Sequence, residues 1–487
     1  MKTKLAFLAI LAACLVAVAL EQPLRYGDGL EYYLMTESLF RHGSPELQPG
    51  DVEAVSALDP EGKADIPKMG FPVGGFFPTV DGQYIGWHFW GYSLSAVPAR
   101  WLLPKLGLDP LSALPVTNAL WFLAAVAVIL FVAPGGWSNA GYLALTLAGP
   151  AWWYIRFTGP EVMSWSCATM AIALLQKKDY ACAALAGAMA SWQNPPAALV
   201  ALAIGLLSLR SRKWFTILAT GVCASAVALP PLYFRSTLGV WNPIAAQPEF
   251  VAGTITFERT WGLVFDWNQG MFPFQPFAVV LGAIGCWKEL RSNRWEAIGL
   301  ALAFAGMVIL VQRATNWNSA CMGVARYSVW MLPILNWWAA RAIASWPRRG
   351  LAVLGWAFAA HIGLVFGMWP ARMDYVKSTF AARTIWTYVP WLDAPDPHVF
   401  YTRVTHRDMP FRPQLTPLAF LSNEPGATKL MLHRDTLDRL WDRFDVTPEY
   451  RTWLKSEAAK HEGVFFVHPP SGAVTPKPGE DGKPPVP

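Results

Sequence analysis

Residues 111–133 read LSALPVTNALWFLAAVAVILFVA, an apolar run that contains no Asp, Glu, Lys or Arg. About 20 consecutive apolar residues are enough for an α-helix to cross the hydrocarbon core of a bilayer. This stretch therefore predicts a membrane-spanning helix, and it places the chain among membrane proteins before any motif is considered.

The composition of the whole chain supports the same conclusion. Of its 487 residues, 54% are hydrophobic and only 15% are charged, whereas an average globular chain carries about 25% charged residues. A soluble or a disordered protein is therefore not expected. The net charge of +6 is small, and no basic run interleaved with aromatic residues indicates nucleic-acid binding. The six Cys form no CxxC motif or Cys/His cluster, so neither a zinc site nor a disulfide framework is predicted.

Further apolar runs follow one another along the chain. Residues 180–209 are interrupted by Gln193-Asn194-Pro195-Pro196, and because proline favours a helix break, they predict two helices joined by a tight hairpin. The run at 5–20 resembles a cleaved signal peptide, but it continues past Cys14 and favours an uncleaved first span. The other runs are 141–157, 162–176, 214–234, 271–287, 297–311, 327–340 and 351–369.

Clusters of basic residues predict which loops are cytoplasmic, because Lys and Arg are enriched on that side of a membrane. Five basic clusters can all lie on the cytoplasmic side of the membrane only if an even number of spans separates each cluster from the next. That condition requires residues 87–103 to lie in the outer interface, or to re-enter it, instead of crossing. The result is a chain of about eleven spans with a cytoplasmic N-terminus and an extracytoplasmic C-terminus, as expected in a bacterial inner membrane. The clusters are Lys2/Lys4, Lys177/Lys178, Arg210/Arg212/Lys213, Lys288/Arg291/Arg294 and Arg341/Arg348/Arg349.

The predicted fold class is an all-α polytopic membrane protein with a small α/β extracytoplasmic domain. Residues 1–370 form the transmembrane module, whose first outer loop, at 21–110, carries interfacial helices. In residues 371–468 charge increases, helical patterns occur at 435–444 and 447–461, and Val464–Val467 is strand-like. Residues 469–487 are rich in Pro, Gly and Lys, and they predict a disordered tail.

Acidic residues next to the predicted outer ends of spans are candidates for a site. Asp28 and Glu31 follow the first span, and residues three apart share one face of a helix. The alternative is a capping box that opens a surface helix. Glu161 lies in a turn between two predicted spans, where ionisable residues are costly and often functional, with Arg156 as its expected partner. A plain Arg–Glu ion pair is the alternative there.

Arginines are predicted at the same outer level as these acids. Arg326 lies at a span end, as does Arg313, and Asp266 precedes the span at 271–287. Acids and arginines at one interface suit chemistry on a phosphate anchored in lipid, since arginines hold phosphate and a carboxylate can act as a base. Solvation at the interface explains each arginine equally well when it is taken singly. No histidine pair has metal-ligand spacing, and no phosphate loop or nucleophile elbow is found.

Several short segments occur in the order in which a known family carries its motifs. They are Gly27-Asp28-Gly29-Leu30-Glu31-Tyr32-Tyr33, Gly86-Trp87-His88-Phe89-Trp90-Gly91-Tyr92, Thr158-Gly159-Pro160-Glu161, Asp266-Trp267-Asn268-Gln269-Gly270 and Gly323-Val324-Ala325-Arg326-Tyr327. In this order they resemble the motifs of the integral-membrane C-type glycosyltransferases (GT-C), which include protein O-mannosyltransferases and lipid A aminoarabinose transferases. The sequence departs from the family pattern at His88, which stands near the usual cation without the usual proline, and at Gln269, which replaces an arginine.

The resemblance implies transfer of a sugar from a polyprenyl-phosphate donor to an envelope acceptor, which is a glycolipid, a glycan or a protein. It implies Asp28 as the base, with inversion at the anomeric carbon, and Glu161 as the residue that positions the acceptor or Asp28. The donor phosphate is expected to be held by Arg156, Arg326 and His88, with Glu31, Asp266, Gln269 and Tyr327 in support. No cofactor is implied with certainty, and a divalent metal stays open.

Two other classes of function are compatible with the sequence. A polymerase, ligase or flippase for lipid-linked glycans is also polytopic and lined by arginines. A non-catalytic membrane scaffold would use its outer domain to bind envelope partners. In each class the chain contacts membrane lipids, and no nucleic-acid partner is expected.

Overall fold

The computed structural model is mostly helical and divides into two compact units. The first unit comprises Met1–Thr254, Phe274–Ala320 and Arg326–Trp369, and the second comprises Ile255–Pro273, Cys321–Ala325 and Pro370–Pro487. The described residues are 2–19, 23, 28–58, 75–247, 253–292, 294–315, 317–318, 321, 323–346, 349–367, 376–407, 411–421 and 426–477.

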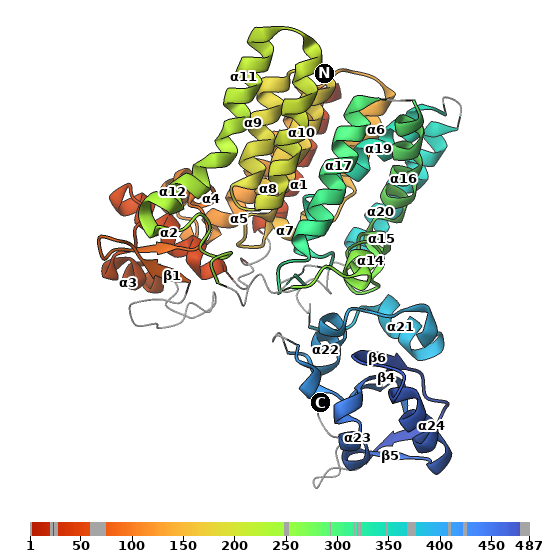
Figure 1. Cartoon of the computed structure of the whole chain (residues 1–487). Helices are drawn as coiled ribbons and strands as arrows, with labels where there is room; N and C mark the ends of the chain where they lie inside the picture. Colours follow the sequence, from red (N-terminus) through yellow and green to blue (C-terminus); the bar gives the residue numbers. More distant parts are fainter. Residues whose placement is uncertain are drawn as a thin grey trace. The chain divides into compact units, whose positions relative to one another are not determined.

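The first unit contains a bundle of helices that lie side by side (Figure 1). Each apolar run predicted as a span, including both halves of the interrupted run, contains a helix in the structure. Within the bundle, α8 packs against α9, α9 against α10, and α19 against both α6 and α16. The helices are α1 (Lys2–Ala19), α5 (Ala113–Ala127), α6 (Trp137–Leu147), α8 (Glu161–Gln176), α9 (Tyr180–Ser191), α10 (Ala198–Ser208), α11 (Trp214–Ala224), α12 (Leu229–Leu238), α16 (Pro276–Arg291), α17 (Trp295–Val311), α19 (Leu332–Ala344) and α20 (Gly350–Gly367).

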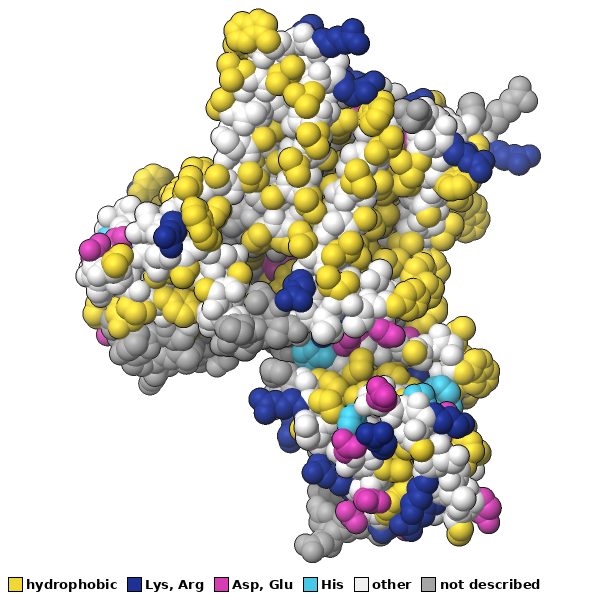
Figure 2. Space-filling view, in the orientation of Figure 1, with side chains coloured by type: hydrophobic (Ala, Val, Ile, Leu, Met, Phe, Trp, Pro, Cys, Tyr) yellow, Lys and Arg dark blue, Asp and Glu magenta, His cyan; other side chains and the backbone are white. Residues whose placement is uncertain are grey.

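Three stretches of the described chain are helical, long and apolar enough to cross a membrane, namely Pro110–Val132, Trp214–Leu238 and Gly350–Gly367. Large apolar side chains are exposed along the sides of the bundle (Figure 2). An apolar surface of this extent suits contact with lipid better than contact with water. The number of crossings and their orientation stay predictions.

The hairpin predicted at Gln193–Pro196 is confirmed. Helix α9 ends at Ser191, a short 3-10 turn spans Pro195–Ala197, and α10 continues from Ala198. The two helices approach closely at Gly187, where an added Cβ atom would lie 3.0 Å from the backbone nitrogen of Ala201. A small residue is needed there because a longer side chain would separate the helices.

Between α1 and α5 the chain forms a smaller substructure of the first unit. It contains α2 (Gly29–His42), α3 (Pro49–Leu58), the antiparallel pair β1 (Phe76–Pro78) and β2 (Tyr84–Gly86), and α4 (Gly91–Lys105). Helices α2 and α4 are joined by a partly buried ion pair in which Arg100 Nε donates to Glu37 Oε2 at 2.8 Å. The helix expected within residues 87–103 is confirmed as α4, whereas the β1–β2 pair was not predicted.

The second unit combines helices with short antiparallel strands. One sheet has the order β3 (Leu418–Leu421), β4 (Ala427–His433), β6 (Val464–Val467), and a second pairs β5 (Phe444–Val446) with β7 (Val474–Pro476). The strand expected at Val464–Val467 and the two helical patterns are confirmed, the latter as α23 (Asp438–Arg443) and α24 (Pro448–Ala458). The remaining helices are α14 (Phe257–Phe265), α21 (Phe380–Tyr388) and α22 (Pro397–Thr405).

The predicted start of the disordered tail at residue 469 is wrong. Strand β7 pairs with β5, and Val474 is fully buried in the core that includes Leu430 and Leu454. The composition that indicated a tail is rich in Pro and Gly, but within it β7 forms a strand pairing and Val474 joins a hydrophobic core. The rest of the predicted tail, 478–487, lies outside the described residues.

Candidate active site

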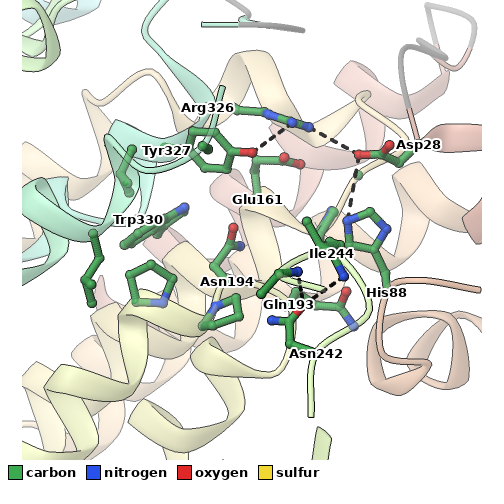
Figure 3. A pocket seen from close by; sticks show the side chains of 18 of the residues that line it. Asp28, His88, Glu161, Gln193, Asn194, Asn242, Ile244, Arg326, Tyr327 and Trp330 are labelled. Carbon is green, nitrogen blue, oxygen red and sulfur yellow. Dashed lines mark hydrogen bonds and ion pairs between the residues drawn. The ribbon is translucent and has the colours of Figure 1, made fainter. Parts of the chain in front are cut away.

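A cavity of about 190 Å³ lies in the first unit, where α2 and α8 begin and α17 ends (Figure 3). Its polar lining comes from segments that are far apart in the sequence. The polar and charged side chains that line it are Asp28, Tyr32, His88, Glu161, Gln193, Asn194, Asn242, Arg313, Arg326 and Tyr327.

Asp28 precedes the first residue of α2, but its side chain makes no capping hydrogen bond. Instead its Oδ2 atom accepts from Arg326 Nη1 at 3.4 Å and lies 3.9 Å from His88 Nε2 (Figure 3). The capping-box explanation is therefore wrong for this pair of acids. The carboxylate of Asp28 is directed into the cavity and lies between two cationic groups.

Glu31 is buried and holds the segment between β2 and α4. Its Oε2 atom lies 2.8 Å from His88 Nδ1, and its Oε1 atom accepts from the backbone N–H of His88 at 2.9 Å. A Cβ atom added at Gly86 would lie only 2.3 Å from Glu31 Oε1. A side chain at the end of β2 would therefore force the carboxylate of Glu31 to move.

The charges of these groups are coupled. Burial lowers the pKa of His88, but the carboxylates of Glu31 and Asp28 outweigh this effect and raise its pKa from 6.5 to about 9. Burial likewise raises the pKa of Asp28, yet the positive charges of His88 and Arg326 leave it below the usual value of 3.8. At neutral pH, His88 is therefore an imidazolium and Asp28 is a carboxylate.

Two arginines supply further positive charge. Arg326, the first residue of α18 (Arg326–Val329), is buried and donates from Nη2 to Tyr327 Oη at 2.9 Å as well as to Asp28. Arg313 follows the end of α17 and also lines the cavity. Guanidinium groups in this position can hold a phosphate by charge-assisted hydrogen bonds.

Glu161 is the first residue of α8, and its side chain is buried. Among the described residues, no donor lies within hydrogen-bond distance of its Oε2 atom. The carboxylate lies over Gly159, where a Cβ atom would come within 2.3 Å of Oε2. In Figure 3 the carboxylate of Glu161 lies beside Tyr327, and Glu161 belongs to the lining of the cavity.

Three residues predicted for the site lie elsewhere. Arg156 is buried after α7 (Ala151–Ile155) and is not part of the described cavity lining. Asp266 and Gln269 belong to the second unit. Asp266 Oδ1 accepts from the backbone N–H groups of Asn268 and Gln269, and Gln269 Oε1 accepts from Arg403 Nη2 at 3.2 Å. These contacts fold a turn, because a short carboxylate that accepts from residues two and three positions ahead closes the chain on itself.

Other residues of the cavity were missed by the sequence analysis. Tyr32 Oη donates to Gln193 Oε1 at 3.3 Å, Gln193 Nε2 donates to the carbonyl of Phe89, and Asn194 Nδ2 donates to Ser164 Oγ at 2.7 Å. The sequence contains a signal for them, because the amide residues Gln193 and Asn194 are adjacent and lie between two apolar runs. The prolines that follow explain the hairpin without any role for the amides.

The side chains of Asp28, Glu31 and His88 are of the types that bind metal ions. One ligand atom from each lies within 4.8 Å of the others. Carboxylate and imidazole ligands fit several divalent ions, but the imidazole must first lose the proton that its hydrogen bond with Glu31 stabilises. A metal is therefore compatible with the residue types, and it would have to compete with that proton.

No protein-family model matches the sequence, and no curated protein matches it. A search of solved structures matches the chain to the crystal structure of ArnT from Cupriavidus metallidurans bound to undecaprenyl phosphate. The two chains are 16% identical, the TM-score is 0.42, and the match covers 79% of this chain and 69% of that chain.

Proposed function

We propose that the protein is a membrane glycosyltransferase that moves a sugar from a polyprenyl-phosphate donor to an acceptor on the outer side of the bacterial inner membrane. One observation carries the proposal. Asp28, Glu161 and Arg326, which come from three distant parts of the chain, line one cavity at the end of the bundle. The basic clusters lie at the opposite ends of the same helices, as in α8, which begins at Glu161 and is followed by Lys177 and Lys178.

Asp28 acts as the base in this proposal. Its carboxylate accepts the proton of the acceptor hydroxyl or amine as the acceptor oxygen or nitrogen bonds to the anomeric carbon. The bond between that carbon and the phosphate oxygen breaks, and its electron pair leaves with the polyprenyl phosphate. The neighbouring cations keep Asp28 ionised, and a positioned base typically contributes about 10²- to 10⁴-fold to the rate.

Arg326 and Arg313 stabilise the departing phosphate. Negative charge develops on the phosphate oxygens in the transition state, and fixed guanidinium groups at a protected site lower the energy of that charge. Because Arg156 does not line the described cavity, Arg313 takes the place first expected for it. His88 adds positive charge through its contacts with Asp28 and Glu31.

Glu161 positions the acceptor. Its Oε2 atom has no donor among the described residues and is free to accept a hydrogen bond from a sugar hydroxyl or an amine. Such a bond orients the attacking group toward the anomeric carbon, and orientation of this kind is a large part of the rate enhancement in bimolecular transfers.

The test begins in cells. Lipid-linked sugars and envelope glycans of a deletion strain are compared by mass spectrometry with those of the strain that carries the gene, which identifies the donor and the acceptor. The full-length protein in lipid nanodiscs is then assayed with that pair. Identical profiles in the two strains, for lipid-linked sugars and glycans alike, would remove the proposal.

Asp28→Asn is the decisive variant. We expect it to reduce transfer by about 10²-fold or more, because the amide cannot accept the proton, while the thermal midpoint stays near that of the wild type. Asp81→Asn, at an exposed residue of the same loop region, is the control that should retain activity. Substantial transfer by Asp28→Asn would exclude Asp28 as the base.

A further inference from the structure

A second cavity, of about 330 Å³, lies at the other end of the helices of the first unit. It is lined by the start of α6, the end of α8, the end of α16, the start of α17, and α19. This is the end of the bundle at which the N-terminus lies in Figure 1 and at which several Lys and Arg side chains gather in Figure 2. The proposed sugar transfer makes no use of it.

The lining contains buried polar atoms without a partner among the described residues. They are Trp337 Nε1, Gln176 Nε2, Ser138 Oγ and Asn139 Oδ1. The side chain of Trp337 is only 6% exposed, and its indole nitrogen can only donate. Buried polar groups are normally hydrogen-bonded, so unmatched groups in the lining of a cavity favour a polar molecule as its ligand. Since three of these four groups can donate, that molecule should be rich in acceptor oxygens.

The charged lining has an excess of cations. Arg341 Nε and Arg294 Nη1 each lie 3.3 Å from an oxygen of Glu289, and Lys178 Nζ contacts Glu296 Oε1. Both carboxylates are therefore already paired, and three cations face two acids. The surplus favours an anion over a cation in the cavity.

The backbone adds donors at the same place. Helix α6 begins at Trp137 after Gly135 and Gly136, and no side chain caps its first N–H groups. Gly136 has φ of +123°, a value that suits glycine and turns the chain into the helix. Free N–H groups at the start of a helix bind anions, and a glycine-rich approach lets a phosphate come close to them. Gly135, Ser138 and Asn139 line the cavity.

We propose that this cavity binds a phosphate group. Unpaired donors, surplus cations and a helix start in the lining of one cavity are the chemistry that phosphate oxygens require. The phosphate belongs either to a lipid headgroup, since basic pockets between transmembrane helices on the cytoplasmic side bind such headgroups, or to a soluble phosphate ester. The site lies apart from the cavity that contains Asp28.

The test measures binding to the full-length protein by native mass spectrometry. The two probes are dihexanoyl-phosphatidylglycerol, as the lipid source, and glycerol phosphate, as the soluble source. Trp337→Phe removes one donor and keeps the aromatic ring, and Arg341→Gln removes one cation. Their matched controls are Trp287→Phe and Arg291→Gln, which change the same residue types on α16 outside the cavity lining.

Trp337→Phe and Arg341→Gln should each weaken binding of at least one probe by about tenfold or more, as expected for hydrogen bonds to a charged group, while the controls leave binding unchanged. Binding of the lipid probe alone assigns the site to a headgroup, and binding of the glycerol phosphate alone assigns it to a soluble ester. Equal binding by Trp337→Phe and the wild type, at an unchanged thermal midpoint, would overturn the proposal, as would no binding of either probe. Sugar transfer measured on the same samples reports separately on the other cavity.

Discussion

Asp28 is ionised because of residues that are remote in sequence. Arg326 is 298 positions away, and His88 is itself held by Glu31 across 57 positions. The positive charges offset the cost of burying the carboxylate, and the hydrogen bonds fix its direction. The acid therefore depends on its neighbours for both charge and orientation, so changes at His88 or Glu31 are expected to act through Asp28.

The charge of His88 predicts a pH dependence of stability. Its pKa in the folded protein, about 9, is above the ordinary value of 6.5. Its stabilising contribution is complete below about 6.5 and is lost as the pH rises through about 9. The thermal midpoint of the wild type should therefore fall more steeply between about pH 7 and about pH 10 than that of His88→Gln. His461→Gln, at a histidine near the end of α24, should keep the steep wild-type slope, and parallel curves for wild type and His88→Gln would contradict the raised pKa.

Glu161 offers a second prediction for a single residue. Burial raises the pKa of Glu161 to about 7, so at about pH 8 the side chain is mostly a carboxylate, which Glu161→Gln replaces by a neutral amide of the same shape. The KM of this variant for the acceptor should rise, or its kcat/KM for the acceptor fall, by about tenfold, because hydrogen bonds to charged groups are worth about 1.5–3 kcal/mol. Binding of the donor should change little. A loss confined to the donor would assign Glu161 to the phosphate instead.

The short elements between α1 and α5 hold the acids in place. Helix α2 carries Glu31, and the segment after β2 carries His88, so the packing of β2 against α2 decides whether the two residues meet. The contact is close at Gly86, where no side chain fits beside the Glu31 carboxylate. A single methyl group at this point is expected to separate the elements.

Gly86→Ala tests this packing. The new Cβ atom would lie 2.3 Å from Glu31 Oε1 and 3.0 Å from Met35 Sδ, so the Glu31–His88 pair must move. We expect transfer to fall by about tenfold and stability by about 1–3 kcal/mol, as for overpacking in a core. The stability loss should shrink in a Glu31→Ala background, which a double-mutant cycle measures. Gly363→Ala, in α20 where an added Cβ meets no atom within 4 Å, is the control, and the same loss there would show that the effect is not local.

At the scale of the molecule, the proposal depends on which side of the membrane each end of the bundle faces. The cavity that contains Asp28 and the cavity that contains Trp337 lie at opposite ends of the same helices. Basic loops favour the cytoplasm, so the Asp28 end is expected outside. A donor carried by a polyprenyl phosphate on the outer leaflet can reach Asp28 only in that orientation.

Cysteine labelling checks the orientation. In a background without the six native cysteines, Cys is placed at Val80, which is 81% exposed near β1, or at Arg212 in the basic loop after α10. A membrane-impermeant maleimide should label Val80→Cys in intact spheroplasts and Arg212→Cys only after lysis. The reverse pattern would place Asp28 in the cytosol and would contradict the proposed transfer.

The sequence alone determined the features that depend on local order. Runs of apolar residues predicted the helices of the bundle, two prolines predicted the hairpin between α9 and α10, and a short apolar run of Val and Phe predicted β6. It also singled out Asp28, Glu161 and Arg326, because polar residues at the ends of apolar runs are unusual and few. Hydropathy and helix breaking are properties of neighbouring residues, so they can be read from the chain directly.

Only the tertiary structure decided which charged groups meet. It paired Glu31 with His88 where a helix cap was the local alternative, brought Arg313 to the cavity, and left Arg156 outside the described lining. It assigned Gln269 to the second unit, where it contacts Arg403. A sequence pattern cannot distinguish two arginines near the ends of apolar runs. The packing of the chain decides which of them reaches the cavity, and the energy of a charge pair depends on its separation and burial.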